Sequence, residues 1–408
     1  MKFIDMFSGI GGFRSALELN GHECIGYSEI DKYAKQSYQA IYDTENEVDL
    51  GDITEISQEY LSQFKEENDI VVGGSPCQAF SLAGKRKGFE DTRGTLFFEY
   101  AKVVKETQPK YFLFENVKGM LSHDKGNTIR VVLETFNELG YYIDFNIFNS
   151  KYYGVPQNRE RIYIVGKRKD LVEQPKYHDK TKGKKKFDEI HNWAVDNINY
   201  VELLPQLQTE ITTRLVDVLE DEVDEKFYLP KEKIEKLVMN LDSNEVIGVR
   251  EATKQGYAVA EQGDSVNVTY PDSKTRRGRV GKQVAQTLQA GEVNQGVVME
   301  DKGIRFTEDG FHTHRNDKKK SSIQGTHVTY KTGKTHALTS NHVPKTIEGL
   351  RIRKLTPLEC WRLQGFTDEQ FYKAKDSGVS NSQLYKQAGN SVTINVVDAI
   401  VKELDKSN

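Results

Sequence analysis

Short apolar segments alternate with helical patterns over the first 166 residues, and this alternation constrains the fold more than any other feature. The apolar runs lie at 3–7, 23–28, 70–72, 111–114 and 161–166, and a helical pattern extends from about 12 to 20. Strands that alternate with helices in this way form a mostly parallel sheet covered on both faces. The sequence therefore predicts an α/β fold with a doubly wound, mostly parallel sheet.

Two of these strands end in residues that can do chemistry. Cys77 follows the run 70–72 through Gly-Gly-Ser-Pro, and Glu115 follows the run 111–114. Open α/β sheets bind ligands at the carboxyl ends of their strands, so the two side chains are expected at one edge. A thiol and a carboxylate there indicate nucleophilic attack assisted by proton transfer. The plainer alternatives are a small buried thiol, as expected for Cys24 and Cys360, and a solvated or helix-capping acid.

Basic side chains surround this pair in the sequence. In an extended segment Arg159 and Arg161 project from one face, where they can orient a carboxylate or a substrate carbonyl and lower a thiol pKa. Between Cys77 and Glu115, residues 81–89 combine small residues and glycines with three consecutive cations, Lys85, Arg86 and Lys87. This composition fits a loop that closes over a polyanion and fits a solvated loop equally well.

A glycine-rich turn, Phe7-Ser-Gly-Ile-Gly-Gly-Phe13, joins the first strand to its helix, where the backbone can approach a ligand. Arg14 stands where the dinucleotide fingerprint has its third glycine, so a phosphate-free adenosine ligand is as plausible as NAD. Glu29 and Asp52 follow at the ends of the next strands, suited to ribose hydroxyls and an adenine amino group. The turn alone could be merely a tight turn; the three features together favour a cofactor site.

Composition excludes several classes of protein. No apolar run reaches the roughly 20 residues that a membrane helix needs, and the strand at 3–7 leaves no room before it for a signal peptide. The three cysteines are odd in number and lack CxxC spacing, which argues against disulfides and zinc and for a reducing cytoplasm. We therefore expect a cytoplasmic protein without a metal. The net charge of −4 gives no global sign of nucleic acid binding.

A chain of 408 residues predicts two lobes. A lysine-rich connection (176–186) leads into an irregular, sheet-rich region, and helical order returns near Thr356. We expect four parts: a first domain at 1–190, a smaller, irregular β-rich domain at 191–345, a hinge with the second part of the small domain at 346–380, and a C-terminal helix completing the first domain at 381–408. An amphipathic pattern over 391–404 supports the last part.

The densest cationic stretch of the irregular region is 274–282, which contains Arg276, Arg277 and Arg279. Arginines near glycines suit contacts with DNA phosphates and with guanine in the major groove. A solvated loop is the alternative.

Five motifs occur in an order that resembles the bacterial C5-cytosine DNA methyltransferases: FSGIGGF at 7–13, SPCQAFS at 75–81, ENV at 115–117, QNRER at 157–161 and GNSV at 389–392. Residues 353–366 resemble the segment that precedes the last motif. Roughly 190–345 matches no motif, where this family has its variable target-recognition region. The resemblance therefore implies a catalytic domain at 1–190 and a target-recognition domain at 191–345. The resemblance implies a class I, Rossmann-like methyltransferase that uses S-adenosyl-L-methionine.

The resemblance also implies roles for individual residues. Cys77 would attack C6 of cytosine, Glu115 would hold N3 and the exocyclic amine, and Arg161, supported by Arg159, would hold the carbonyl oxygen. The cofactor would be bound by Phe7, Gly9, Gly11, Glu29, Asp52, Ile53, Pro76, Leu96, Asn390 and Ser391. DNA would be contacted by Ser81, Lys85, Arg86, Lys87, Arg276, Arg277, Arg279 and Thr287.

The activity expected on this basis is transfer of a methyl group to C5 of a cytosine flipped out of a short specific site in double-stranded DNA. We expect a monomer, either the modification enzyme of a restriction-modification system, with a cognate endonuclease, or a phage or solitary methylase. Two alternatives are a catalytically inactive DNA-binding protein and an RNA cytosine-5 methyltransferase. Cys77, Glu115, Arg159 and Arg161 argue against the first, and the long recognition lobe against the second.

Overall fold

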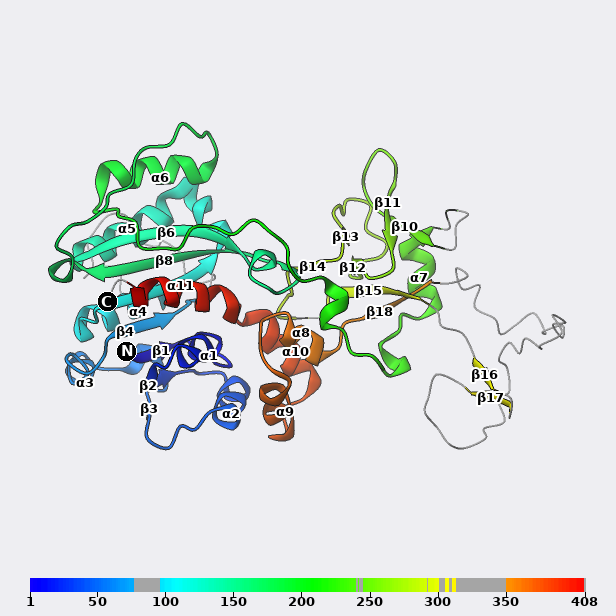
Figure 1. The fold of residues 1–408 in the computed structure, drawn as a ribbon, viewed down its shortest axis with the longest axis horizontal. Coiled ribbons are helices and arrows are strands. Elements are labelled where there is room, and N and C mark those ends of the chain that lie inside the picture. Colours follow the sequence, from blue (N-terminus) through cyan, green and yellow to red (C-terminus); the bar gives the residue numbers. More distant parts are fainter. Residues whose placement is uncertain are drawn as a thin grey trace. The chain divides into compact units, whose positions relative to one another are not determined.

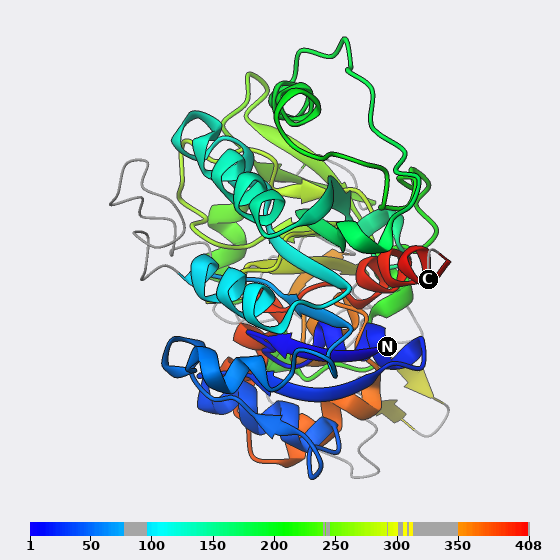
Figure 2. The same cartoon turned by 90° about the vertical axis from the view of Figure 1, so that its left-hand side faces the viewer.

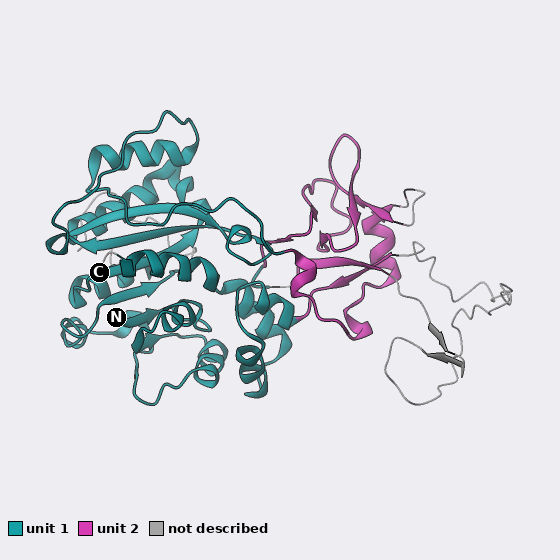
Figure 3. Cartoon of the chain, viewed as in Figure 1, with its two compact units in different colours: residues 1–213, 289–292, 357–408 teal, residues 214–288, 293–356 magenta. Residues whose placement is uncertain are grey.

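The computed structural model describes residues 1–76, 96–239, 241, 245–291, 293–300 and 350–406, together with the backbone of 305–307 and 310–312. Its described residues form two compact units (Figures 1 and 3). Unit 1 comprises Met1–Thr213, Gln289–Glu292 and Pro357–Asn408, and unit 2 comprises Arg214–Leu288 and Val293–Thr356. Cys77 and the loop residues Ser81, Lys85, Arg86 and Lys87 lie outside the described residues.

The centre of unit 1 is a sheet that has, within the described residues, seven strands in the order β3-β2-β1-β4-β5-β8-β6. These strands are β1 (Lys2–Met6), β2 (Glu23–Ser28), β3 (Val48–Asp49), β4 (Ile70–Gly73), β5 (Tyr111–Val117), β6 (Tyr141–Asn149) and β8 (Glu160–Arg168). Strands β1 to β5 pair in parallel, which confirms the predicted fold class. Strand β8 is antiparallel to both of its neighbours, because no helix crosses the sheet between β6 and β8.

Helices cover both faces of this sheet (Figure 2). Those of unit 1 are α1 (Gly12–Leu19), α2 (Lys32–Ile41), α3 (Gln58–Ser62), α4 (Leu96–Thr107), α5 (Asn127–Glu138), α6 (Lys186–Asn197), α8 (Pro357–Arg362), α9 (Asp368–Asp376), α10 (Asn381–Asn390) and α11 (Ile394–Lys406). Helix α11 packs on α1, so the C-terminal segment completes the first domain. Its apolar residues recur every four positions, which buries one stripe of the helix.

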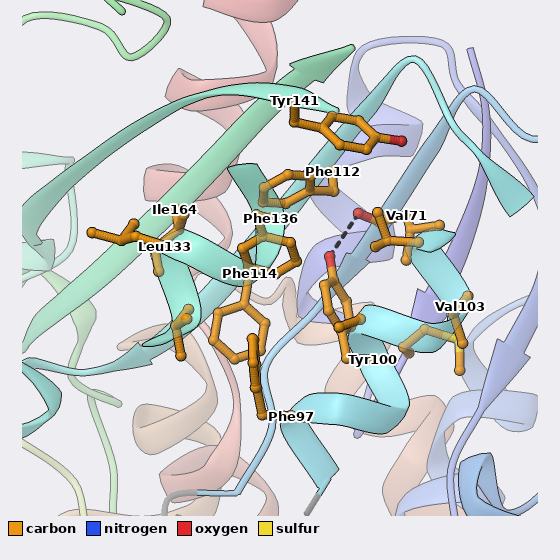
Figure 4. Close-up of a cluster of buried hydrophobic side chains, with 14 of the residues drawn as sticks. Val71, Phe97, Tyr100, Val103, Phe112, Phe114, Leu133, Phe136, Tyr141 and Ile164 are labelled. Carbon is orange, nitrogen blue, oxygen red and sulfur yellow. Dashed lines mark hydrogen bonds between the residues drawn. The ribbon is translucent and has the colours of Figure 1, made fainter. Parts of the chain in front are cut away.

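Aromatic rings fill the core between the sheet and the helices α4 and α5 (Figure 4). Phe112 of β5 stacks on Phe136 of α5 with ring centroids 4.0 Å apart, and Phe97 of α4 meets Phe136 edge-on. The hydroxyl group of Tyr100 donates to the carbonyl oxygen of Val71 at 3.0 Å. This packing fixes β4 and β5, the two strands whose ends carry the predicted reactive residues.

Unit 2 consists mainly of small antiparallel sheets. One sheet has the order β11-β10-β9 and another the order β13-β12-β15-β18. The elements are α7 (Lys231–Leu237), β9 (Val238–Met239), β10 (Val246–Arg250), β11 (Tyr257–Glu261), β12 (Ser265–Asn267), β13 (Val280–Gly281), β14 (Ala285–Gln286), β15 (Gln295–Glu300), β16 (Arg305–Thr307), β17 (Gly310–His312) and β18 (Leu350–Lys354). This unit is the separate, sheet-rich region that the sequence predicts.

The boundaries of the units differ from the predicted ones at 190, 345 and 380. Residues up to 213 belong to unit 1, because α6 packs on α5 and Tyr200 pairs with Ile143 of β6. Residues from 357 onward also belong to unit 1, because α8 packs on α10 and α9 packs on α2. The roles assigned to the predicted parts, catalysis and target recognition, stay predictions at this point.

Two further findings concern the described residues alone. None of their helices combines the length and apolar character that crossing a membrane requires. None of their His, Cys, Asp and Glu side chains gather into a group that could hold a metal ion.

The aromatic core generates the first prediction. Replacing Phe136 by alanine removes the ring that contacts Phe97 and Phe112, so we expect the free energy of unfolding to fall by about 3–5 kcal/mol. Chemical denaturation of the full chain measures this change. The matched control is Leu19→Ala at an exposed position of α1, expected to change stability by less than about 0.5 kcal/mol. Equal effects of the two substitutions would contradict this account of the core.

Candidate active site

The structure brings Glu115, Arg159 and Arg161 together at the end of β5. The Nε atom of Arg161 lies 3.1 Å from Oε1 of Glu115, and both side chains are largely buried. Arg159 is 2% exposed and also acts electrostatically on Glu115. Glu115 lies in β5, Arg161 lies in β8, and Arg159 directly precedes β8. Strands β5 and β8 pair along their length. Their predicted convergence is therefore found in the structure.

Burial sets the protonation behaviour of this cluster. It raises the pKa of the Glu115 carboxyl above its usual range, whereas the charges of Arg161 and Arg159 oppose that rise. Burial, followed by the like charge of Arg161, lowers the pKa of Arg159 to about 9. A buried carboxyl whose pKa is raised holds its proton at higher pH than a solvated one and can act as a proton donor.

The segment that leads to Cys77 starts against this cluster. A Cβ atom on Gly74 would lie 2.9 Å from Oε2 of Glu115, so any larger residue would collide with the carboxylate. The amide of Asn116 donates to the carbonyl oxygen of Ser75 at 2.9 Å and ties the segment to β5. The segment therefore lies against the end of β5 at Gly74 and Ser75, and Ser75 is two residues before the predicted nucleophile.

The C-terminal motif reaches the same place through Arg159. Its guanidinium group donates to the carbonyl oxygens of Gly389 at 3.2 Å and Ser391 at 2.6 Å. Gln364 donates to the carbonyl oxygen of Ala388 at 2.8 Å and so supports the same turn. Sequence reasoning did not assign a role to Gln364 or Asn116; both lie within recognised motifs, but their targets are backbone atoms that no spacing predicts.

The glycine-rich turn has the backbone shape that a close ligand needs. Phe7, Gly9 and Gly11 have φ angles of 55°, 57° and 81°, in the left-handed region. Gly11 is the N-cap residue of α1 and has no side chain that could bond the first N–H groups of the helix. A Cβ atom on Gly12 would lie 2.9 Å from Oγ of Ser391, so the turn lies against the C-terminal motif.

Glu29 links this turn to the end of β2. Its carboxylate accepts the N–H groups of Gly9 at 2.8 Å and Asp31 at 2.7 Å. Burial raises the pKa of Glu29, and these hydrogen bonds oppose that rise. The neighbouring side chain of Ile30 is 70% exposed. A carboxylate with lone pairs remaining beside an exposed apolar side chain fits a ribose and a flat base.

The side chains of the other predicted cofactor residues differ in their exposure and in their contacts. Asp52 caps the short helix Ile53–Glu55, and one of its oxygens accepts from both Thr54 groups. The Ile53 side chain is buried in the core. Pro76 and Asn390 are exposed, Leu96 begins α4 at an intermediate exposure, and Ser391 is buried as the C-cap of α10.

Arg14, at the position of the missing third glycine, is buried beneath this site. Its guanidinium group bonds to Glu18 and Glu47 and lies 4.4 Å from the ring centroid of Tyr42. Because these contacts bury the Arg14 side chain against α1, the position is filled by a large side chain where a dinucleotide fingerprint has glycine.

Unit 2 places the predicted DNA-contacting arginines in different environments. Arg276 is half-buried with its guanidinium carbon 5.7 Å from the ring centroid of Tyr270, and Arg277 is exposed. Tyr270 is 74% exposed and has a φ of 47°, which is unusual for an aromatic residue. Its exposure makes it a candidate contact that sequence reasoning missed, because only the folded backbone reveals it.

Arg279 differs from the expectation of an exposed guanidinium. It is 1% exposed, and it donates to the carbonyl oxygens of Asn267, Thr269 and Tyr270 at 3.0, 2.8 and 2.6 Å. Its charge is thus used inside unit 2, where it braces the loop that carries Tyr270. Thr287 accepts a hydrogen bond from Asn294 through its carbonyl oxygen.

Comparison with known proteins agrees with this arrangement. The family described as C-5 cytosine-specific DNA methylase matches residues 1–406. The orphan methyltransferase M.SPRI of Bacillus phage SPR is 40% identical over 99% of this chain and 97% of its own length. The type II methyltransferase M.HhaI of Haemophilus parahaemolyticus is 34% identical over 100% of this chain and 95% of its own length.

A solved structure is similar in fold. The S. pombe Dnmt2 methyltransferase has a TM-score of 0.56 and 17% identity, covering 100% of this chain and 98% of that one. The family match over nearly the whole chain, together with two relatives above 30% identity, shows the family. The chain belongs to the C-5 cytosine-specific DNA methylases and is a DNA (cytosine-5-)-methyltransferase.

Proposed function

We propose that this enzyme methylates a flipped-out cytosine in a short specific sequence of duplex DNA, with S-adenosyl-L-methionine as the methyl donor and Cys77 as the nucleophile. The observation that carries the proposal is the convergence of Glu115, Arg159 and Arg161 beside Gly74, where the segment leading to Cys77 begins. Because C5 of a stacked cytosine is out of reach of these side chains, the base must leave the duplex.

Cytosine C5 is too weak a nucleophile to be methylated unaided. The Cys77 thiolate would bond to C6, and the electrons of the C5–C6 double bond would move toward C5. Glu115 would give a proton to N3 and accept from the exocyclic amine, and Arg161 would donate to the carbonyl oxygen, so that both stabilise the ring. After methyl transfer, water would take the C5 proton, and the electrons of the C5–H bond would restore the C5–C6 double bond as the Cys77–C6 bond breaks and releases the thiolate. N3 would return its proton to Glu115.

Ten residues would hold the cofactor: Phe7, Gly9, Gly11, Glu29, Asp52, Ile53, Pro76, Leu96, Asn390 and Ser391. When bound, S-adenosyl-L-methionine supplies an electrophilic methyl group for C5. The fit rests on the left-handed glycine turn, on the lone pairs that remain on Glu29, and on the exposed apolar side chain of Ile30. Arg159 would hold the Ser391 turn in register with Glu115, and so align the donor with the base.

For DNA recognition we propose the loop of unit 2 that carries Tyr270, Arg276 and Arg277. An exposed aromatic ring beside guanidinium groups suits stacking and contacts with phosphates or guanine. Arg279 would act through this loop and not on the DNA itself. Thr287 and, beyond the described residues, Ser81, Lys85, Arg86 and Lys87 complete the proposed DNA contacts. Relatives include an orphan phage enzyme and type II enzymes, so a solitary and a restriction-linked role are both compatible.

Cys77→Ala should abolish methyl transfer, a loss on the order of 10³-fold or more, because no thiolate remains to activate C5. It should also abolish the covalent adduct with DNA that contains 5-fluorocytosine, while DNA binding persists. Labelled cofactor, denaturing gels and a binding assay measure the three quantities. Cys24→Ala, which removes a buried thiol elsewhere in unit 1, is the control and should keep the adduct. Normal turnover by the Cys77 variant would refute the assigned nucleophile.

The pH dependence of catalysis should report on Glu115. Because burial raises its pKa, the protonated form persists to higher pH and is lost as the pH rises through that raised value. The single-turnover rate should therefore fall on this alkaline limb, and Glu115→Gln should be slow and lack the limb. Glu160→Gln, at the exposed neighbour paired with Lys118, should keep the wild-type profile. An unchanged limb in the Glu115 variant would assign the proton to another group.

Arg276→Ala and Arg279→Ala should separate DNA contact from support. Arg276→Ala should weaken DNA binding or relax target choice, with the unfolding free energy nearly unchanged. Arg279→Ala removes the arginine donor from the buried carbonyl oxygens of Asn267 and Thr269, so stability should fall by on the order of 3 kcal/mol. Competition binding across sequences and chemical denaturation measure these effects. A stable Arg279 variant with altered specificity would return that arginine to the DNA interface.

A further inference from the structure

We propose that the lysine loop, which we define as residues 182–185, binds DNA phosphates outside the target site and so extends the DNA contact of unit 1. The inference rests on the proposed function, because it takes duplex DNA as the partner. It concerns a segment that the family motifs do not include and that the mechanism does not use.

The lysines of this segment fall into two groups. Lys176 and Lys180 are paired with Glu202 at 2.5 Å and with Asp196 at 2.7 Å. Lys182, Lys184 and Lys185 are exposed, and no carboxylate pairs with them among the residues that the structure describes. Three cations within four residues repel one another unless anions lie nearby, so they favour a polyanionic partner.

The nearby acids are already engaged. The carboxylate of Asp188 accepts the backbone N–H of Lys185 at 2.8 Å. Glu189 is bonded to both Lys186 and Arg130 at 2.8 Å. Glu189 therefore neutralises other cations, whereas Asp188, bonded to a neutral N–H, keeps its charge beside the loop and offsets one of the three lysines. The remaining exposed positive charge stands out on a chain of net charge −4.

The loop is held in one shape. Thr181 and Asn192 exchange two hydrogen bonds, of 2.8 and 2.9 Å, and the N–H of Gly183 donates to Oγ1 of Thr181 at 3.2 Å. A Cβ atom on Gly183 would lie 2.2 Å from the Asp188 carboxyl group, so glycine permits this tight approach to the start of α6. An anchored loop loses little backbone entropy when its side chains bind a ligand.

The loop is fixed to the segment that follows the reactive strand. Nζ of Lys186 donates to the carbonyl oxygen of Lys125 at 2.9 Å, and α6 also packs on the short helix Lys118–Leu121. That helix begins directly after Val117, two residues beyond Glu115. Both views show α6 beside α5, the helix that continues this segment (Figures 1 and 2). The lysine loop is thus anchored, through α6, to residues 118–125, the segment that directly follows β5 and Glu115.

Phosphates of a duplex are the anions that fit this surface. Lysine acts as a strongly hydrated point charge that carries no sequence information, so it suits phosphates and not base edges. The amino end of α6 carries Asp188 and Glu189 in its first turn, so its partial positive charge is already offset and the lysines carry the attraction. A duplex that reaches beyond the methylated site would bring its regularly spaced phosphates to these groups.

The test compares two double variants of the full chain that remove the same formal charge, Lys182→Gln/Lys184→Gln and Lys176→Gln/Lys180→Gln. Binding is measured against salt concentration, on a long duplex and on one trimmed to the target site. For the long duplex, the slope of log Kd against log salt should fall by about 2 in the first variant. It should stay near the wild-type value in the second variant, and the trimmed duplex should abolish the difference.

An unchanged slope in the first variant, an equal change in both, or an effect that persists on the trimmed duplex would overturn the proposal. Methyl transfer at saturating DNA is measured in parallel and should match the wild-type rate in both variants. This readout separates the two hypotheses: a wild-type enzyme that transfers no methyl group to DNA would refute the proposed function, whatever the salt slopes.

Discussion

The active-site arrangement depends on one buried guanidinium group. Arg159 donates to the carbonyl oxygens of Gly389 and Ser391, and its charge opposes the rise that burial causes in the Glu115 pKa. Ser391 in turn lies against Gly12 of the glycine-rich turn. Three segments that are far apart in sequence are thereby held around one cation. Removing this charge would release the C-terminal turn and leave buried carbonyl oxygens without a donor.

Arg159 and Arg161 have different surroundings and therefore different proposed roles. Arg159 is fully enclosed and bonded to backbone, so its role is positional, and burial has lowered its pKa to about 9. Arg161 remains partly accessible and pairs with Glu115, which supports the proposal that it, and not Arg159, contacts the cytosine. In water, a carboxyl group placed as Glu115 is, beside the charges of Arg159 and Arg161, would be ionised. Burial of the Glu115 carboxyl acts against both cations and raises its pKa above the usual range.

The sequence predicted β1, β2, β4, β5 and β8 and placed Glu115 near Arg159 and Arg161, because apolar runs and motif order depend on local pattern. It did not predict β6, and the meeting of Cys77 with Glu115 stays a prediction. It did not predict which arginines of 276–279 are buried. Arg276 and Arg279 have similar neighbours in sequence, but only Arg279 is enclosed by the carbonyl groups of residues 267–270. The unit boundary at 213 likewise follows from packing of α6 on α5, and the antiparallel β8 from the absence of a crossover helix.

Charge in this chain is organised by pairing more than by composition. In the connection between β8 and unit 2, Lys176 and Lys180 are each neutralised by an acid of the same segment. Surface pairs of this kind add little to stability, but they lower the positive electrostatic potential that attracts a polyanion. Where pairing is absent among the described residues, as at 182–185, the charge stays available for a partner. A net charge of −4 is therefore compatible with DNA binding, because the binding field depends on where unpaired cations lie.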